Sequence, residues 1–120
     1  MDLNVYFMMQ ETLQKKMFGY EVPTDSVESF KYSILSLVGE IGEVLEADKR
    51  WKNIRNEQYD RNNKLDELVD CMAFLINAIL FSGFSEKEFS IAFKQKFLYN
   101  LRRLGKEGES IGGSNRPTQT

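Results

Sequence analysis

The segment from Leu68 to Phe81 constrains the fold of this chain more than any other part of the sequence. It is apolar at almost every position, and Asp70 and Asn77 are its polar interruptions. A helix that is apolar on all sides is expected to be buried on most of them. A carboxylate in such a helix is costly to bury unless it is paired or bound to a metal. The segment therefore predicts a core helix and a partner for Asp70.

Helical periodicity extends over the rest of the chain, and no alternation of period two is long enough to predict a strand. We expect an all-α fold of about four helices. The expected helices cover Leu3–Phe18, a stretch that starts after Thr24, Asp25 or Ser26 and ends near Trp51, then Lys64–Phe81, and Ser85 to about Leu104. The polar segment Asn53–Asn63 is expected to form a loop.

The domain organisation follows from the same pattern. Residues 1–105 are predicted to form one all-α domain, and residues 106–120, which are rich in Gly and Ser, a disordered tail. No apolar run is long enough to span a membrane, and the first residues do not read as a targeting segment. We therefore expect a cytoplasmic protein without a membrane partner.

Composition excludes several kinds of chemistry. The chain has no histidine, which rules out Ser-His-Asp catalysis and zinc sites that use His. Its single cysteine, Cys71, cannot form an internal disulfide. A net charge of −2 argues against binding of a nucleic-acid polymer through a large basic excess. The chemistry that remains is that of carboxylates, Lys and Arg side chains, amides and hard cations.

Two acidic pairs stand on neighbouring predicted helices. Glu40 and Glu43 are three residues apart and share a helix face, and Glu67 and Asp70 repeat this spacing. If these helices pack antiparallel, four carboxylates converge. Without cations they would raise one another's pKa values, whereas Mg²⁺, or Mn²⁺ as the alternative, would find the oxygen ligands that hard cations prefer.

Each acidic pair also has an ordinary explanation. A single pair like Glu40 and Glu43 is common at the solvated edge of a helix. Glu67 and Asp70 could form an acidic first turn, which the helix dipole favours. The two pairs together are more specific than either one alone.

A third set of polar residues lies on the last predicted helix. Lys96, Asn100 and Arg103 are spaced i, i+4, i+7 and therefore line one face. Lysine and arginine there could neutralise phosphate charge. The alternative is a solvated basic face near a helix C-terminus, which the dipole also favours.

These motifs resemble those of the all-α nucleoside triphosphate pyrophosphatases, which include the MazG-like proteins and the dimeric dUTPases. The resemblance lies in Gly39–Glu46 followed by Glu67–Asp70, in Trp51-Lys52, in Met9-Gln10-x-x-Leu13, and in the Lys96, Asn100, Arg103 element. It implies metal ligation by Glu40, Glu43, Glu67 and Asp70, phosphate binding by Lys96, Asn100 and Arg103, and substrate or base binding by Gln10, Trp51 and Lys52. Asn77 is a further candidate for substrate binding, because it lies seven residues after Asp70 on nearly the same side of the helix.

The resemblance further implies a Mg²⁺-dependent enzyme that converts a (deoxy)nucleoside triphosphate to the monophosphate and pyrophosphate. Glu43, with Glu40, would be catalytic, Glu43 taking a proton from the attacking water. Two alternatives stay open: a helical interaction domain without catalytic activity, and a pyrophosphohydrolase that acts on a phosphoribosyl compound.

Oligomerisation is the last expectation. The helix from Lys64 to Phe81 is apolar all round, yet the chain has few other helices to cover it. We therefore expect a MazG-like helical bundle that is completed in a homodimer or homotetramer. The resemblance implies the same.

Overall fold

The computed structural model describes residues 2–19, 25–52 and 58–109. Across these residues the fold is all-α, as predicted. Its elements are α1 (Leu3–Phe18), α2 (Val27–Ala47), the short 3-10 helix η1 (Lys49–Lys52), α3 (Arg61–Phe81) and α4 (Glu86–Glu109). Helices α1 to α3 belong to one compact unit, and α4 belongs to a second unit that is described by itself.

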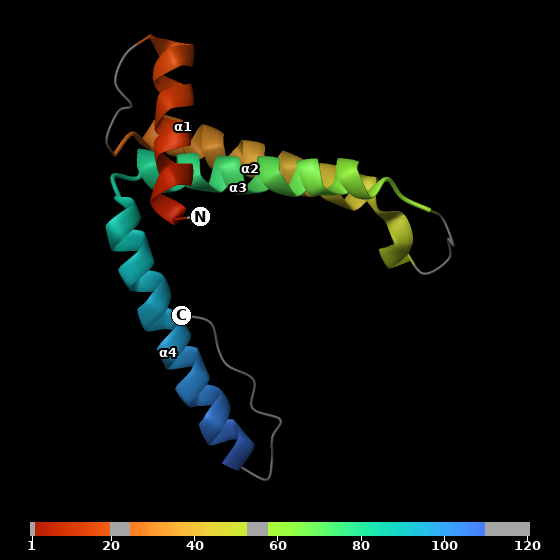
Figure 1. Ribbon diagram of the computed structural model, residues 1–120, viewed down its shortest axis with the longest axis vertical. Coiled ribbons are helices and arrows are strands. Elements are labelled where there is room, and N and C mark those ends of the chain that lie inside the picture. The colour runs from red at the N-terminus through yellow and green to blue at the C-terminus, as the bar shows by residue number, and fades with distance from the viewer. Residues whose placement is uncertain (1, 20–24, 53–57, 110–120) are drawn as a thin grey trace. The chain divides into compact units, whose positions relative to one another are not determined.

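In the first unit, α2 and α3 lie side by side and run antiparallel, and α1 crosses them where α3 ends (Figure 1). Ser26 caps α2 by accepting a hydrogen bond from the Ser29 N–H at 3.2 Å. The Ser26 N–H donates to the carbonyl oxygen of Phe81 at 2.7 Å. This bond joins the start of α2 to the end of α3.

The helix boundaries differ from the sequence expectation in three places. Helix α2 ends at Ala47 and not near Trp51, because Asp48 adopts an extended conformation with φ −140° and ψ 101°. Helix α3 begins at Arg61, before Lys64, because the Asp60 carboxylate caps the first turn. Helix α4 continues to Glu109, into the segment for which a disordered tail is predicted. Residues 110–120 and residues 53–57 of the expected loop lie outside the described residues.

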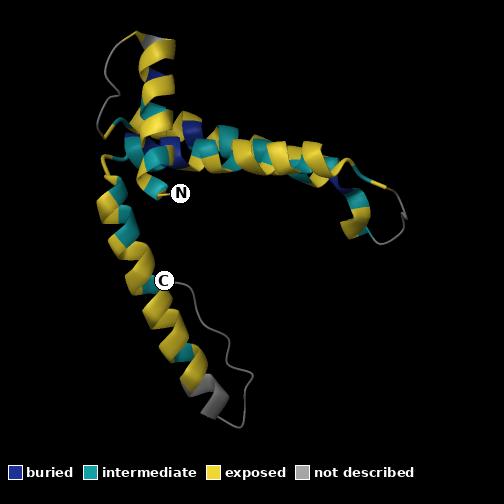
Figure 2. Cartoon of the chain, viewed as in Figure 1, coloured by how far each residue is buried: buried dark blue, intermediate teal, exposed yellow. Residues whose placement is uncertain are grey.

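The apolar core of the described chain is small. Its buried apolar side chains are Phe7, Ile76, Ala78 and Phe81, which come from α1 and from the last turns of α3. Several apolar side chains that share one face of α2 by their helical spacing are exposed, Val38 at 62% and Ile41 at 48% among them. Figure 2 shows the exposed positions that run along α2 and α3.

Within the described part of the chain, no single helix is long and apolar enough to cross a membrane. Only the combined residues of α3 and α4 would have the length and the apolar composition of a membrane-spanning segment.

Candidate functional site

Carboxylates from α2 and α3 converge across the interface of the two helices. One oxygen from each of Glu40, Glu67 and Asp70 lies within 4.8 Å of the others. Glu67 and Asp70 are three residues apart on α3 and therefore project from one face. Glu40 and Glu67 are half-buried, and Asp70 is exposed. We call these three residues the acidic cluster.

Glu43, the fourth residue expected to bind the metal, lies one turn further along α2 and is exposed. Its oxygens are not among those within 4.8 Å. Its charge nevertheless acts on the acidic cluster, because it contributes to a raised pKa at Glu67. The structure thus gathers three of the four expected ligands and leaves Glu43 at their edge.

The pKa of Glu67 is raised above its ordinary value. Partial burial is the largest cause, followed by the hydrogen bond to the Glu40 carboxyl and the charges of Glu40, Glu43 and Asp70. Crowded carboxylates of this kind cannot all ionise without a cost. A divalent cation would offset it, and an all-oxygen donor set is what Mg²⁺ and Mn²⁺ prefer. The residues present therefore fit such an ion.

Glu67 and Asp70 do not form an acidic first turn of the helix, which was the ordinary explanation for this pair. Because α3 begins at Arg61, its first turn contains no acidic residue. Glu67 and Asp70 stand in the following turns, where the field of the helix N-terminus has largely fallen off.

In the metal-free protein, the contribution of Glu67 to stability is expected to fall as the pH rises above 4.5, the ordinary glutamate value. With a raised pKa, folded Glu67 keeps its proton at pH values where the unfolded chain has released it. The stabilisation is complete below 4.5 and is lost as the pH rises through the raised pKa. Thermal melts in chelator should show this loss. Glu67→Gln, which cannot titrate, should remove that part of the pH slope, and an unchanged slope would contradict the assignment.

A cavity of about 590 Å³ opens beside the acidic cluster, between α1, α2 and α3. Asp70 belongs to both, since it lines the cavity and contributes an oxygen to the acidic cluster. The walls combine apolar and polar side chains: Leu13, Met17, Ala73, Phe74 and Phe81, with Gln10, Gln14, Ser29, Ser33 and Asn77. Mostly apolar walls with a few oriented polar groups are typical of small-molecule sites.

Two of the predicted substrate-binding residues meet in this cavity. The Gln10 side-chain N–H donates to the Asn77 side-chain oxygen at 2.9 Å. Asn77 is 5% exposed, although it lies in an apolar stretch of α3. The hydrogen bond joins α1 to α3, and both residues line the cavity, where amide donors and acceptors could read the polar edge of a ligand.

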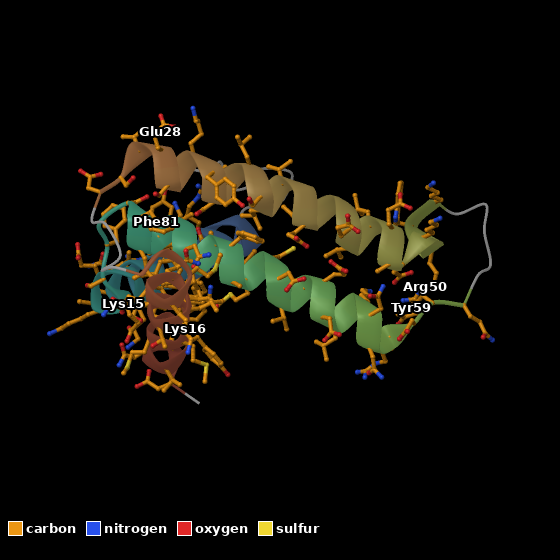
Figure 3. All side chains as sticks on the ribbon, turned by 90° about the horizontal axis from the view of Figure 1, so that it is seen from above. Lys15, Lys16, Glu28, Arg50, Tyr59 and Phe81 are labelled. Carbon is orange, nitrogen blue, oxygen red and sulfur yellow. The ribbon has the colours of Figure 1, made fainter. Side chains whose placement is uncertain are left out.

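Trp51 and Lys52 lie elsewhere, in η1 at the other end of α2. The Trp51 indole N–H donates to the Leu45 carbonyl oxygen at 3.1 Å, and the Lys52 Nζ lies 5.5 Å from the centre of the Trp51 ring. Neither residue is among the described side chains that line the cavity. Figure 3 shows the separation, with Phe81 at one end of the α2–α3 pair and Arg50, the neighbour of Trp51, at the other.

The expected phosphate-binding residues all lie on α4, within the second unit. Tyr99 stands between the two cations, with the Lys96 Nζ at 5.8 Å and the Arg103 guanidinium at 5.5 Å from its ring centre. Asn100 is exposed. Lys96 and Arg103 thus share one face of α4, as their spacing predicts.

Sequence reasoning missed several residues of the site. Gln14 is 7% exposed, lines the cavity and lies four residues after Gln10, a spacing that puts both amides on one face of α1. Ser33 is buried at 1% and donates its hydroxyl hydrogen to the Ser29 carbonyl oxygen at 2.9 Å. The spacing of four residues between Gln10 and Gln14 could have identified Gln14 from the sequence, whereas nothing in the sequence indicates that Ser33 is buried at the site.

The described residues thus form an all-α protein in which an acidic cluster lies next to a cavity with the size and lining of a small-molecule site. The dUTPase family model matches residues 2–107, and the chain belongs to this family. No curated protein and no solved structure matches the chain.

Proposed function

We propose that the protein is a Mg²⁺-dependent nucleoside triphosphate pyrophosphohydrolase that converts a (deoxy)nucleoside triphosphate to the monophosphate and pyrophosphate. The observation that carries the proposal is the position of Asp70, which is shared by the acidic cluster and the cavity. A ligand that is apolar and hydrogen-bonding at one end and polyanionic at the other suits such a pair of neighbouring sites. A nucleoside triphosphate has this character, and membership of the dUTPase family supports it.

The substrate would lie with its base in the cavity. The paired amides of Gln10 and Asn77 offer both donors and acceptors to the base edge. Phe74 and Phe81 line the same cavity and offer aromatic surface. Trp51 and Lys52 lie at the far end of α2. They would bind a part of the substrate remote from the base, or the substrate in the site of a neighbouring copy.

The acidic cluster would hold the metal, with Glu40, Glu67 and Asp70 as ligands and Mn²⁺ as an alternative to Mg²⁺. When bound, such an ion polarises phosphate oxygens and lowers the pKa of a water molecule. Glu43, which is exposed at the edge of the cluster, would accept the proton of the attacking water. Water would add to the α- or the β-phosphorus, the bond between that phosphorus and the bridging oxygen would break, and the monophosphate and pyrophosphate would separate. Lys96, Asn100 and Arg103 of α4 would bind the phosphates and offset their charge.

The proposal is tested with purified protein, Mg²⁺ and a panel of canonical and modified nucleotides. We expect pyrophosphate and a monophosphate as products, and loss of activity in EDTA. Release of inorganic phosphate alone would point to a different cleavage. Absence of turnover on every nucleotide, together with turnover of a phosphoribosyl diphosphate compound, would favour the second enzymatic alternative.

The exposed apolar faces of α2 and α3 support a second part of the proposal, assembly into a homodimer or homotetramer. Leu68 is 46% exposed and Val69 57% exposed on α3, next to the acidic cluster. Monomeric proteins rarely leave contiguous apolar surface of this kind uncovered. The same surface would serve a partner protein if the chain were an interaction domain without activity.

Light scattering should give a mass that is two or four times 14.0 kDa. Val69→Glu, which puts a charge on the apolar face of α3, should shift the population towards monomer. Lys31→Gln makes the same change in net charge on a side chain that is 61% exposed, and it should leave the mass unchanged. A wild-type mass of 14.0 kDa at micromolar concentration would refute assembly.

A further inference from the structure

Asp48 is a charged residue that the chain keeps buried, with only 9% of its surface exposed. It follows the last residue of α2 and accepts hydrogen bonds from two cations. The Arg50 guanidinium binds both carboxylate oxygens, through Nε at 2.8 Å and Nη2 at 2.7 Å. The Lys64 Nζ, from the first turn of α3, binds Oδ2 at 2.8 Å. A buried carboxylate with two cationic partners thus joins the end of α2 to the start of α3.

Tyr59 completes this arrangement. The Arg50 guanidinium carbon lies 3.9 Å from the centre of the Tyr59 ring, and the Lys64 Nζ lies 5.2 Å from it. Cations at these positions are attracted to the ring face. Figure 3 shows Arg50 and Tyr59 together at this end of the α2–α3 pair. We call Asp48, Arg50, Tyr59 and Lys64 the Asp48 clasp.

Stability alone does not account for the Asp48 clasp. Burying an ion pair costs desolvation, and apolar residues of similar volume often stabilise a fold equally well. A directional, charge-assisted contact does something that an apolar contact does not, since it fixes the distance and orientation of the two groups. The relevant distance here is that between α2 and α3.

The acidic cluster needs such a constraint close by. Lys64 lies one turn before Glu67 on α3, and Asp48 follows Glu43 by five residues on the α2 side. Without a cation, the carboxylates of α2 and α3 repel one another across the interface. The Asp48 clasp pulls the same two chain segments together next to this repulsion. Its partners hold the pKa of Asp48 well below the ordinary range, so the attraction persists wherever the acidic cluster is ionised.

We propose that the Asp48 clasp holds α2 and α3 at the separation that a divalent cation needs, so that Asp48 and Lys64 are positioning residues for the metal ligands Glu40, Glu67 and Asp70. The inference rests on the proposed function, because it assumes that the acidic cluster binds a metal. Loss of the clasp should weaken cation binding, because part of the binding free energy is then used to bring the helices together.

The test is direct titration with Mn²⁺, in which the signal of the free ion is followed by electron paramagnetic resonance. Asp48→Asn and Lys64→Gln should each weaken Mn²⁺ binding about 10- to 100-fold, the range for residues that orient metal ligands. Lys64→Arg, which keeps the ion pair, should restore most of the affinity. The control is Glu46→Gln, which changes net charge as Asp48→Asn does but removes only the exposed pair with Lys49, at 3.4 Å.

Lys64→Gln separates positioning from simple electrostatics. Removal of a positive charge near the acidic cluster would by itself tighten Mn²⁺ binding, whereas loss of the clasp weakens it. If Asp48→Asn or Lys64→Gln fails to fold by circular dichroism, Asp48→Glu gives the readout, since it keeps the charge but lengthens the side chain that bonds Lys64, and it should also weaken Mn²⁺ binding. Absence of Mn²⁺ binding in the wild type would count against the proposed function. Wild-type Mn²⁺ affinity in folded Lys64→Gln, or in Asp48→Glu where Lys64→Gln does not fold, would overturn the role of the clasp alone.

Discussion

Glu67→Gln and Asp70→Asn should each lower the rate of pyrophosphate release by at least about 100-fold, since the loss of residues that merely support metal ligands already costs about 10- to 100-fold. Both residues belong to the acidic cluster, and Asp70 also borders the cavity. Their amide variants keep the shape of the side chain but remove the charge that a hard cation requires. Rates at several Mg²⁺ concentrations measure the effect.

Melting temperatures measured with and without Mg²⁺ connect this loss of activity to the metal. Mg²⁺ should raise the melting temperature of the wild type, because a ligand that binds the native state stabilises it, and this rise should vanish in Glu67→Gln. Asp66→Asn is the matched control: it makes the same charge change next to Glu67, on an exposed residue outside the acidic cluster. Equal rates in Asp66→Asn and Asp70→Asn would remove the acidic cluster from the mechanism.

Phe7→Ala should reduce the free energy of unfolding by about 3–5 kcal/mol, the usual cost of truncating a buried Phe. Phe7 is 2% exposed and is the largest of the fully buried side chains in the described chain. Since a domain is typically stable by only about 5–15 kcal/mol, this is a large part of the total. The loss should fall on the docking of α1, which carries Gln10 and one wall of the cavity.

Urea denaturation of Phe7→Ala and Met8→Ala separates two effects on stability, the loss of side-chain packing and the change in helix propensity that an alanine brings. Met8 is the next residue on α1 and is 56% exposed, so its truncation should change stability by less than about 0.5 kcal/mol. Midpoints that coincide for the two variants would mean that α1 is not held by Phe7. Nucleotide affinity should fall with Phe7→Ala and not with Met8→Ala.

The parts of the structure that depend on local sequence were predictable. The bounds of α1 are confirmed at Leu3 and Phe18, because a left-handed glycine, Gly19 with φ 73°, ends the helix. The antiparallel pairing of α2 and α3 brings Glu40 to Glu67 and Asp70, as the two acidic spacings indicated. In the first case a cap determines the outcome, and in the second a spacing of three residues puts Glu67 and Asp70 on one face of α3, which the pairing with α2 then brings to Glu40.

The parts that depend on tertiary contacts were not predictable. A helix continued past Ala47 would place Asp48 in the apolar arc of α2, and the helical periodicity gives no reason for a charge there. The reason is Lys64, sixteen residues away, together with the Arg50 side chain. The same dependence applies to the apolar face of α2, where Val38 and Ile41 stay exposed in the single chain although the periodicity places them in the core. Periodicity identifies an apolar face and not what covers it.

Anomalous diffraction of Mn²⁺, in crystals grown with a non-hydrolysable nucleoside triphosphate analogue, would locate the metal and the substrate together. We expect a peak in contact with carboxylate oxygens of Glu40, Glu67 and Asp70, with the base of the analogue in the cavity beside Gln10 and Asn77. A Mn²⁺ peak bound elsewhere, or an analogue whose phosphates lie away from these three carboxylates, would contradict it.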